Sequence, residues 1–126
     1  MIDKTKTILV VDDMPSLRKI VMRALKGDGF EHFAEANDGN EAYQVLQNAK
    51  PEVGLIISDW NMPNCSGLDF LRLVRKDPRY VKLQFLMVTS EAEKGQILEA
   101  IKAGVTGYIL KPFTAESLCQ RVKSLV

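Results

Sequence analysis

Short apolar runs alternate with amphipathic stretches along the chain. Residues 7–11 and 53–58 form largely apolar runs rich in β-branched residues, which is typical of strands buried on both faces of a sheet. Runs at residues 83–89 and 107–110 predict two more strands, and a weaker run at residues 32–36 predicts a fifth. Because no repeat, linker or low-complexity stretch interrupts the alternation, we expect one domain over residues 1–126 with no separate output domain.

The stretches between these runs show the spacing of amphipathic helices. Apolar residues recur every three or four positions from Leu17 to Leu25, and two glycines then mark a helix end. The same spacing predicts four more helices, around residues 42–49, from residue 68 to the Asp77–Pro78 pair, and over residues 92–103 and 115–125. Five strand–helix units with strands apolar on both faces predict an α/β fold, a doubly wound sandwich with a parallel sheet between two helix layers.

Residues that can carry chemistry lie at the ends of four predicted strands. The set comprises Asp12 and Asp13 after the first strand, Asp59 after the third, Thr89 and Ser90 at the end of the fourth, and Lys111 after the fifth. In a doubly wound sheet, ligands bind outside the carboxyl ends of the strands. A lone Asp there is commonly a helix cap and a lone Lys a solvated charge. The whole set at matching ends instead indicates one shared site.

The residue types narrow the chemistry of this site. Three neighbouring carboxylates cannot all stay ionised without a cation, and oxygen ligands without His or Cys favour Mg²⁺. A bound Mg²⁺ could bridge to a phosphoryl oxygen, Lys111 and Thr89 could contact the others, and one carboxylate would remain to attack phosphorus. Asp59 is the best nucleophile candidate because its strand is central. The spacing alone leaves Asp12 and Asp13 open.

Other classes of site fit the sequence less well. Neither GxxxxGK[ST] nor GxGxxG is present, and the acidic pair after the first strand would repel a nucleotide or flavin phosphate. The only histidine, His32, lies at a predicted strand start, so we expect it to be structural or exposed. Cys65 and Cys119 lack metal-ligand spacing and are interpreted as free thiols.

Composition excludes further classes of function. The chain of 126 residues has a formal net charge of +1 and no run rich in Lys or Arg, which indicates neither nucleic-acid binding nor a membrane surface. Residues 1–7 are polar, and no apolar run is long enough to span a bilayer. We therefore expect a cytoplasmic protein without membrane insertion.

Four separated motifs resemble the receiver domain of two-component response regulators. They are VVDD at residues 10–13, SDWNMP at 58–63 with Gly67, VTSE at 88–91, and GYILKPF at 107–113. The resemblance covers essentially the whole chain and is nearest to the stand-alone chemotaxis regulators of that family. It implies a flavodoxin-like (βα)5 fold with strand order 2-1-3-4-5 and a cis peptide bond between Lys111 and Pro112.

The resemblance also implies a role for each site residue. Asp59 would be the phosphoacceptor, and Mg²⁺ would be held by Asp13, Asp59 and the backbone carbonyl of Asn61, with Asp12 acting through water. Lys111 would be the cation that contacts the phosphoryl group. Thr89 would be the hydroxyl that moves on activation, and Tyr108 the aromatic that moves between exposed and buried rotamers. Asn61 and Glu91 would tune the lifetime of the phosphate.

The resemblance implies a signalling protein as well. A sensor histidine kinase would be the phosphodonor, a flagellar motor-switch protein or another target would bind the activated form, and a phosphatase is a further partner. The protein would act as a monomer. The expected partner surface lies on the fourth helix, fifth strand and fifth helix, with Lys94, Ile97, Ile101, Tyr108 and Arg121 as its members. One of the adjacent Ile97 and Leu98 would be exposed, unless a broad buried stripe accommodates both.

Two alternatives to a chemotaxis switch stay open. The first is a phosphorelay intermediate, or another stand-alone receiver, that acts outside chemotaxis. The second is a phosphohydrolase with Asp59 as covalent nucleophile. Such enzymes usually carry an acid two residues after the nucleophile, where this chain has Asn61, which cannot transfer a proton usefully. We therefore expect slow autodephosphorylation at most, and no turnover enzyme.

Overall fold

Five strands and five α-helices alternate along the chain. The computed structural model describes residues 2–90 and 94–125. Its elements are β1 (Thr7–Val11), α1 (Pro15–Gly27), β2 (Phe33–Ala36), α2 (Gly39–Asn48), β3 (Val53–Asp59), α3 (Gly67–Lys76), the 3-10 helix η1 (Pro78–Tyr80), β4 (Gln84–Thr89), α4 (Lys94–Lys102), β5 (Gly107–Leu110) and α5 (Ala115–Ser124).

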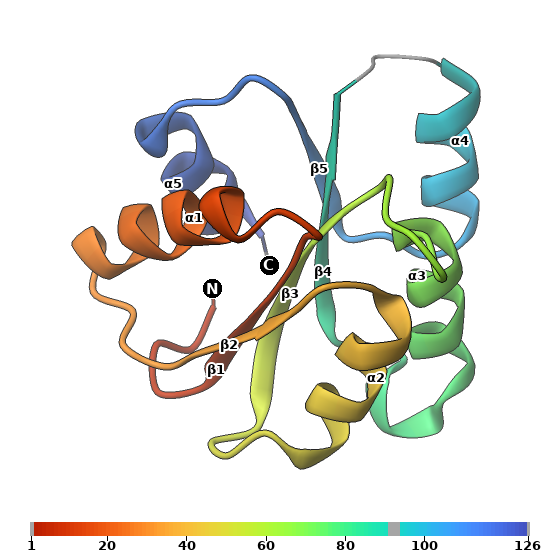
Figure 1. Cartoon of the computed structure of the whole chain (residues 1–126), viewed down its shortest axis with the longest axis horizontal. Helices are drawn as coiled ribbons and strands as arrows, with labels where there is room; N and C mark the ends of the chain where they lie inside the picture. Colours follow the sequence, from red (N-terminus) through yellow and green to blue (C-terminus); the bar gives the residue numbers. More distant parts are fainter. Residues whose placement is uncertain (1, 91–93, 126) are drawn as a thin grey trace.

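The strands form one parallel sheet in the order β2-β1-β3-β4-β5. Helices α1 and α5 cover one face of the sheet, and α2, α3 and α4 cover the other (Figure 1). The predicted α/β class, the doubly wound (βα)5 sandwich and the strand order are all confirmed. Among the described residues, no helix combines the length and apolar character that a membrane span requires.

Each central strand buries side chains on both faces, so the sheet separates two cores. Leu9 and Ile56 pack with residues of α2, α3 and α4, whereas the adjacent Ile8 and Ile57 pack with residues of α1 and α5. This alternation follows from the period of two along a strand. It explains why the central strands are apolar at successive positions. The buried polar residues of the central strands lie at or next to the strand ends.

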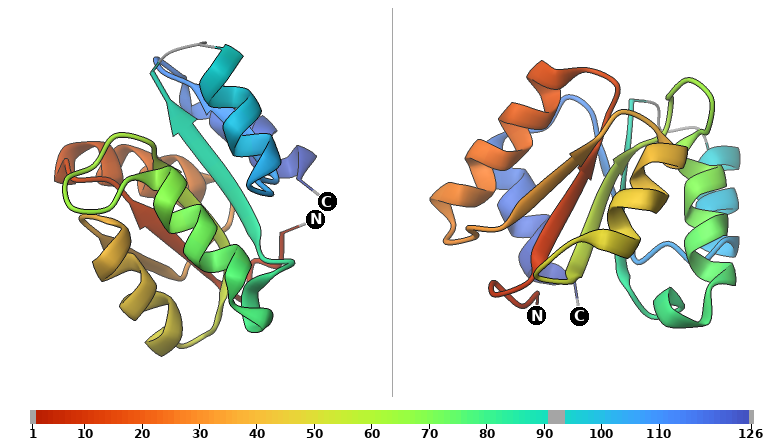
Figure 2. Two further views of the ribbon diagram at one scale, coloured as in Figure 1. Left: turned by 90° about the vertical axis from the view of Figure 1, so that its right-hand side faces the viewer. Right: turned by 60° about the horizontal axis from the view of Figure 1, so that its bottom comes forward.

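The carboxyl ends of β1, β3, β4 and β5 lie at the same end of the sheet (Figure 2). The loop after β3 is tied to the start of α2, because the Gly39 N–H donates to the Cys65 carbonyl at 3.2 Å and the Asn64 amide donates to Asp38 at 3.1 Å. Asp38 also caps α2 by accepting from the Glu41 N–H. Hydrogen bonds therefore fix the backbone that leads away from the strand end.

Some predicted boundaries were wrong. His32 lies outside β2, although its carbonyl accepts from the Ile8 N–H. Leu83 precedes β4, Leu125 lies beyond α5, and Asp59 is the last residue of β3 because it continues the pairing with β4. The sequence pattern also did not predict η1. Helix α2 begins before the position expected, and α4 ends at Lys102, whereas α3 ends at Lys76, next to the Asp77–Pro78 pair as predicted. The predicted start of α4 at residue 92 lies outside the described residues.

The first residue of α3 leaves no room for a side chain. A Cβ on Gly67 would overlap the carbonyl oxygen of Asp59 and approach the Met87 sulfur at 3.0 Å, whereas a Cβ on Gly27 would meet nothing within 4 Å. We expect Gly67→Ala to lower the free energy of unfolding by about 1–3 kcal/mol, as overpacking commonly does. Gly27→Ala, the matched control at the end of α1, should be neutral or stabilising by up to about 1 kcal/mol. Urea denaturation measures both, and equal effects would contradict the packing argument.

Candidate functional site

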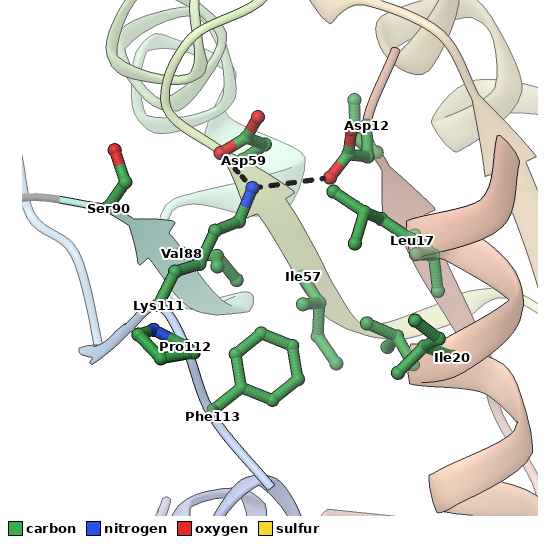
Figure 3. Close-up of a pocket in the computed structure, with 13 residues that line it drawn as sticks. Asp12, Leu17, Ile20, Ile57, Asp59, Val88, Ser90, Lys111, Pro112 and Phe113 are labelled. Atoms are coloured by element: carbon green, nitrogen blue, oxygen red, sulfur yellow. Dashed lines mark ion pairs between the residues drawn. The ribbon is translucent and has the colours of Figure 1, made fainter. Parts of the chain in front are cut away.

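The strand ends bring an ammonium group between two carboxylates. The Nζ atom of Lys111 lies 3.2 Å from Oδ1 of Asp59 and 3.8 Å from Oδ2 of Asp12. Figure 3 shows Lys111, which follows β5, reaching across to residues that end β3 and follow β1. Residues separated by up to a hundred positions therefore meet because parallel strands end at one edge of the sheet. The convergence predicted for these three residues is confirmed.

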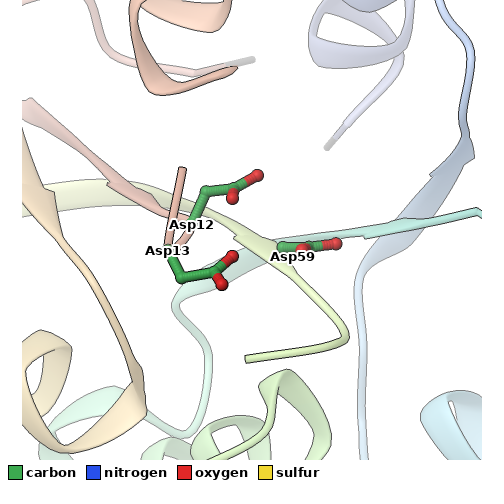
Figure 4. A group of neighbouring side chains, drawn as sticks. All are labelled: Asp12, Asp13 and Asp59. Carbon is green, nitrogen blue, oxygen red and sulfur yellow. The ribbon is translucent and has the colours of Figure 1, made fainter. Parts of the chain in front are cut away.

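A third carboxylate completes an acidic cluster. Carboxylate oxygens of Asp12, Asp13 and Asp59 lie within 4.8 Å of one another, with Asp13 exposed and the other two buried (Figure 4). Three oxygen donors of this kind, one of them open to solvent, suit a hard and partly hydrated cation such as Mg²⁺. The residues present therefore fit the metal that the sequence suggested.

Burial makes ionisation of this cluster costly. Asp12 and Asp59 are 7% and 8% exposed. Burial raises the pKa of the Asp59 carboxyl, although the Lys111 ammonium and hydrogen bonds act in the opposite direction. Burial also raises the pKa of the Asp12 carboxyl, and the nearby Asp59 charge adds to this increase. One ammonium is thus insufficient to balance the acidic groups, and a divalent cation would relieve the excess negative charge.

Backbone amides orient the two buried carboxylates. The Trp60 N–H donates to Oδ1 of Asp59 at 2.9 Å, and the Met14 N–H donates to Oδ1 of Asp12 at 2.9 Å. Oδ1 of Asp59 is therefore held by a backbone amide on one side and by the Lys111 ammonium on the other.

The remaining strand-end residues lie beside this cluster. Thr89, the last residue of β4, is buried, and its carbonyl accepts from the Lys111 N–H at 2.8 Å. The peptide bond between Lys111 and Pro112 is cis, as the resemblance implied. Ser90 lines the same site and is exposed. Asn61 is exposed in the loop after β3, and Glu91 lies outside the described residues. The roles assigned to these residues stay predictions.

A mostly apolar cavity of about 440 Å³ lies beside the charged groups. Figure 3 shows Leu17, Ile20 and Phe113 around it, and Asp59 and Lys111 also line it. The sequence pattern did not predict this cavity, because its lining combines residues of α1 and of the segment after β5, which lie far apart in the chain.

The expected partner surface is partly exposed. Ile101 is 56% exposed on α4, and the Arg121 guanidinium of α5 lies 5.9 Å from the centre of the half-buried Tyr108 ring. Of the adjacent apolar pair, Leu98 is 55% exposed and Ile97 is half-buried, so the prediction of one exposed apolar residue there is confirmed. The side chain of Lys94 lies outside the described residues. Leu110, 39% exposed at the end of β5, is an addition that the sequence pattern did not indicate.

The histidine and the two cysteines, which the sequence did not assign to the site, are as expected. His32 is exposed, outside the acidic cluster. Cys65 and Cys119 are free thiols.

Arg18 on α1 was not among the predicted site residues, yet its guanidinium donates to the carbonyl of Asp12. Its helical position resembles that of any surface arginine, so no sequence signal distinguishes it.

Comparison with known proteins agrees with this geometry. The chemotaxis protein CheY of Pseudomonas aeruginosa is 44% identical over 118 residues, which are 94% of each chain. CheY-3 of Vibrio cholerae is 41% identical over 125 residues, covering 99% of this chain and 95% of the relative. The solved structure of the chemotaxis response regulator CheY4 of Vibrio cholerae superposes with a TM-score of 0.87 at 34% identity, covering 97% of this chain and 99% of that one.

A family profile matches most of the chain. The profile is that of the response regulator receiver domain, and the match runs over residues 8–123. This range contains β1 from Ile8 onward, the other four strands and the whole acidic cluster. The chain therefore belongs to the response regulator receiver domain family.

Proposed function

We propose that this protein is a signalling switch that accepts a phosphoryl group on Asp59 in a Mg²⁺-dependent reaction. The observation that carries the proposal is the Lys111 ammonium, 3.2 Å from Asp59 and 3.8 Å from Asp12, beside a third carboxylate. Asp59 is preferred over its neighbours because it ends the central strand β3 and holds Lys111 more closely. The resemblance to receiver domains supports the same choice.

The chain's own groups would divide the reaction among them. A carboxylate oxygen of Asp59 would form a bond to phosphorus as the bond between phosphorus and the donor's leaving group breaks, and the leaving group would depart with that electron pair. Lys111 would balance negative charge on one phosphoryl oxygen, and the Thr89 hydroxyl would donate to another. Asp13, Asp59, the Asn61 carbonyl and, through water, Asp12 would hold Mg²⁺, which neutralises phosphoryl charge when bound.

The product would be a signal and not the start of a catalytic cycle. A phosphoryl group adds roughly two negative charges and new acceptor oxygens, so Thr89 and Lys111 would reorganise around it. As Thr89 moves, Tyr108 would pack more deeply. Asn61 offers no group to activate water, so we expect slow loss of phosphate, with Asn61 and Glu91 setting its lifetime.

The pathway proposed is chemotaxis in the cytoplasm, because the relatives at 41% and 44% identity carry chemotaxis names. A sensor histidine kinase would supply the phosphoryl group. A flagellar motor-switch protein would bind the surface formed by α4, β5 and α5, a phosphatase would end the signal, and the protein would be a monomer. A phosphorelay intermediate that passes the group to a histidine is the alternative.

Labelling tests the phosphoacceptor. With Mg²⁺ and acetyl phosphate, the wild type should gain one phosphoryl group, and Asp59→Asn should lose at least about 99% of the label because the amide is not a nucleophile. Asp69→Asn, which changes an exposed aspartate of α3, is the matched control and should label as the wild type does. Intact-protein mass spectrometry measures all three. Label that persists in Asp59→Asn would overturn the assignment.

The fluorescence of Trp60 should report the cation. Trp60 is 8% exposed and directly follows Asp59, so binding of Mg²⁺ should change its emission and saturate with concentration. Because the pKa values of Asp12 and Asp59 are raised, protons should compete with Mg²⁺ above the ordinary pKa of an aspartate. The apparent affinity should therefore fall as the pH is lowered from 7. An affinity constant that stays flat down to the ordinary aspartate pKa would contradict the site.

The same shifts predict the stability of the metal-free protein. Below the ordinary pKa of an aspartate, Asp12 and Asp59 are protonated in both the folded and the unfolded state. Their ionisation then does not affect the free energy of unfolding. As the pH rises above the ordinary pKa, the unfolded state loses these protons while the folded state keeps them, so the free energy of unfolding falls until the pH has passed the raised pKa values. Urea denaturation in EDTA should therefore show a destabilising contribution at pH 7 that Asp59→Asn reduces.

Target binding tests the signalling surface. Ile101→Glu should weaken binding of the phosphorylated protein to an immobilised flagellar motor-switch protein by about tenfold or more, because a charge would replace an exposed apolar contact. Val81→Glu changes another exposed apolar residue, 47% exposed between η1 and β4, and should bind normally. Both variants should label with acetyl phosphate as the wild type does. Equal binding by Ile101→Glu and Val81→Glu would show that the interface lies elsewhere on the protein.

A further inference from the structure

An arginine of α1 joins three segments near the acidic cluster. The Arg18 side chain is 11% exposed. Its Nη1 atom donates to the Asp12 carbonyl at 2.5 Å and to Oδ1 of Asn37 at 2.9 Å, and its Nε atom donates to Oε1 of Glu35 at 2.9 Å. One guanidinium therefore connects the loop after β1 with the end of β2 and the loop that follows it.

The acceptors of Arg18 are themselves held in place. Glu35 lies in β2 and pairs with Val10 of β1 in the sheet. The Asn37 N–H donates to Oε1 of Glu41 in α2 at 3.1 Å. Arg18 is thus anchored on one side to the sheet and α2, and it reaches on the other side to the acidic loop. Movement of that loop relative to β2 would break these contacts together.

The bond to the Asp12 carbonyl controls the direction of Asp13. That carbonyl belongs to the peptide group whose nitrogen is the backbone nitrogen of Asp13, and the peptide group is planar. The Asp12 N–H, on the preceding peptide, donates to the Ala36 carbonyl at 3.1 Å. The backbone is therefore fixed on both sides of Asp12, and the exposed carboxylate of Asp13 starts from a defined position beside Asp59.

We propose that Arg18 is a positioning residue that presets the Asp12–Asp13 loop for cation binding. The proposal rests on the proposed function, since it deepens the account of the same Mg²⁺ site. A guanidinium suits this position because its planar donors serve three acceptors at once, whereas a lysine ammonium is a compact point charge on a flexible stem. Glu35 neutralises much of the positive charge, so the ion pair limits its repulsion of a bound cation.

Magnesium affinity distinguishes positioning from charge. Three variants are compared with the wild type by Trp60 fluorescence: Arg18→Met, Arg18→Lys and, as control, Arg72→Met, which removes a half-exposed arginine of α3. We expect both Arg18 variants to bind Mg²⁺ about tenfold more weakly, a typical effect of losing a group that orients a metal ligand. Arg72→Met should bind as the wild type does. If the charge of Arg18 mattered instead, Arg18→Met would bind Mg²⁺ more tightly, which would overturn the proposal.

A second measurement separates positioning from general loss of structure. At saturating Mg²⁺, both Arg18 variants should label with acetyl phosphate to within about twofold of the wild-type rate, because Asp59, Thr89 and Lys111 are intact. If Arg18→Met unfolds, as circular dichroism would show, Arg18→Lys decides the question. An unaltered dissociation constant in the folded variant contradicts the role of Arg18 alone. A wild type that shows no response to Mg²⁺ contradicts the proposed function itself, and the positioning role falls with it.

Discussion

The concentration of buried negative charge at one edge of the sheet constrains the rest of this site. Asp12 and Asp59 lie in contact with a single ammonium and with a third carboxylate nearby. Burial raises the pKa values of both buried groups, so the metal-free site holds its charges at a cost in free energy. Binding of a cation would lower this cost, and the bound cation would then assist phosphoryl transfer. The folded protein retains this costly arrangement because the strong packing of the two cores supports it.

The surrounding backbone limits how far the charges can relax. Gly67 allows α3 to begin against the Asp59 carbonyl, and the Trp60 and Met14 amides hold the two carboxylates in fixed orientations. The β3–α3 loop is in turn tied to α2. Because neighbouring segments fix this end of the sheet, added charge at Asp59 would act through Lys111, which contacts Asp59 and directly follows β5. This route leads toward the expected partner surface, where exposed apolar residues of α4 and β5 lie.

Much of this organisation could be predicted from local pattern. The central strands are apolar at successive positions because both faces are buried, and that signal predicted the sheet and placed Asp12, Asp59 and Lys111 at its edge. The resemblance to receiver domains added the strand order. Local pattern failed where a single side-chain contact decides the structure: η1 depends on the Asp77 side chain capping the Arg79 N–H. Arg18 could not be predicted because its partners lie 6, 17 and 19 positions away and one of them is a backbone carbonyl.

The central claim is that a covalent bond to phosphorus forms at Asp59 and not at its acidic neighbours. Borohydride reduces an aspartyl phosphate to homoserine, so peptide mass spectrometry after labelling and reduction locates the bond directly. The account predicts homoserine at position 59 in the protein treated with Mg²⁺ and acetyl phosphate, and none when the metal is chelated. Homoserine at position 12 or 13, or aspartate unchanged at all three positions, would contradict it.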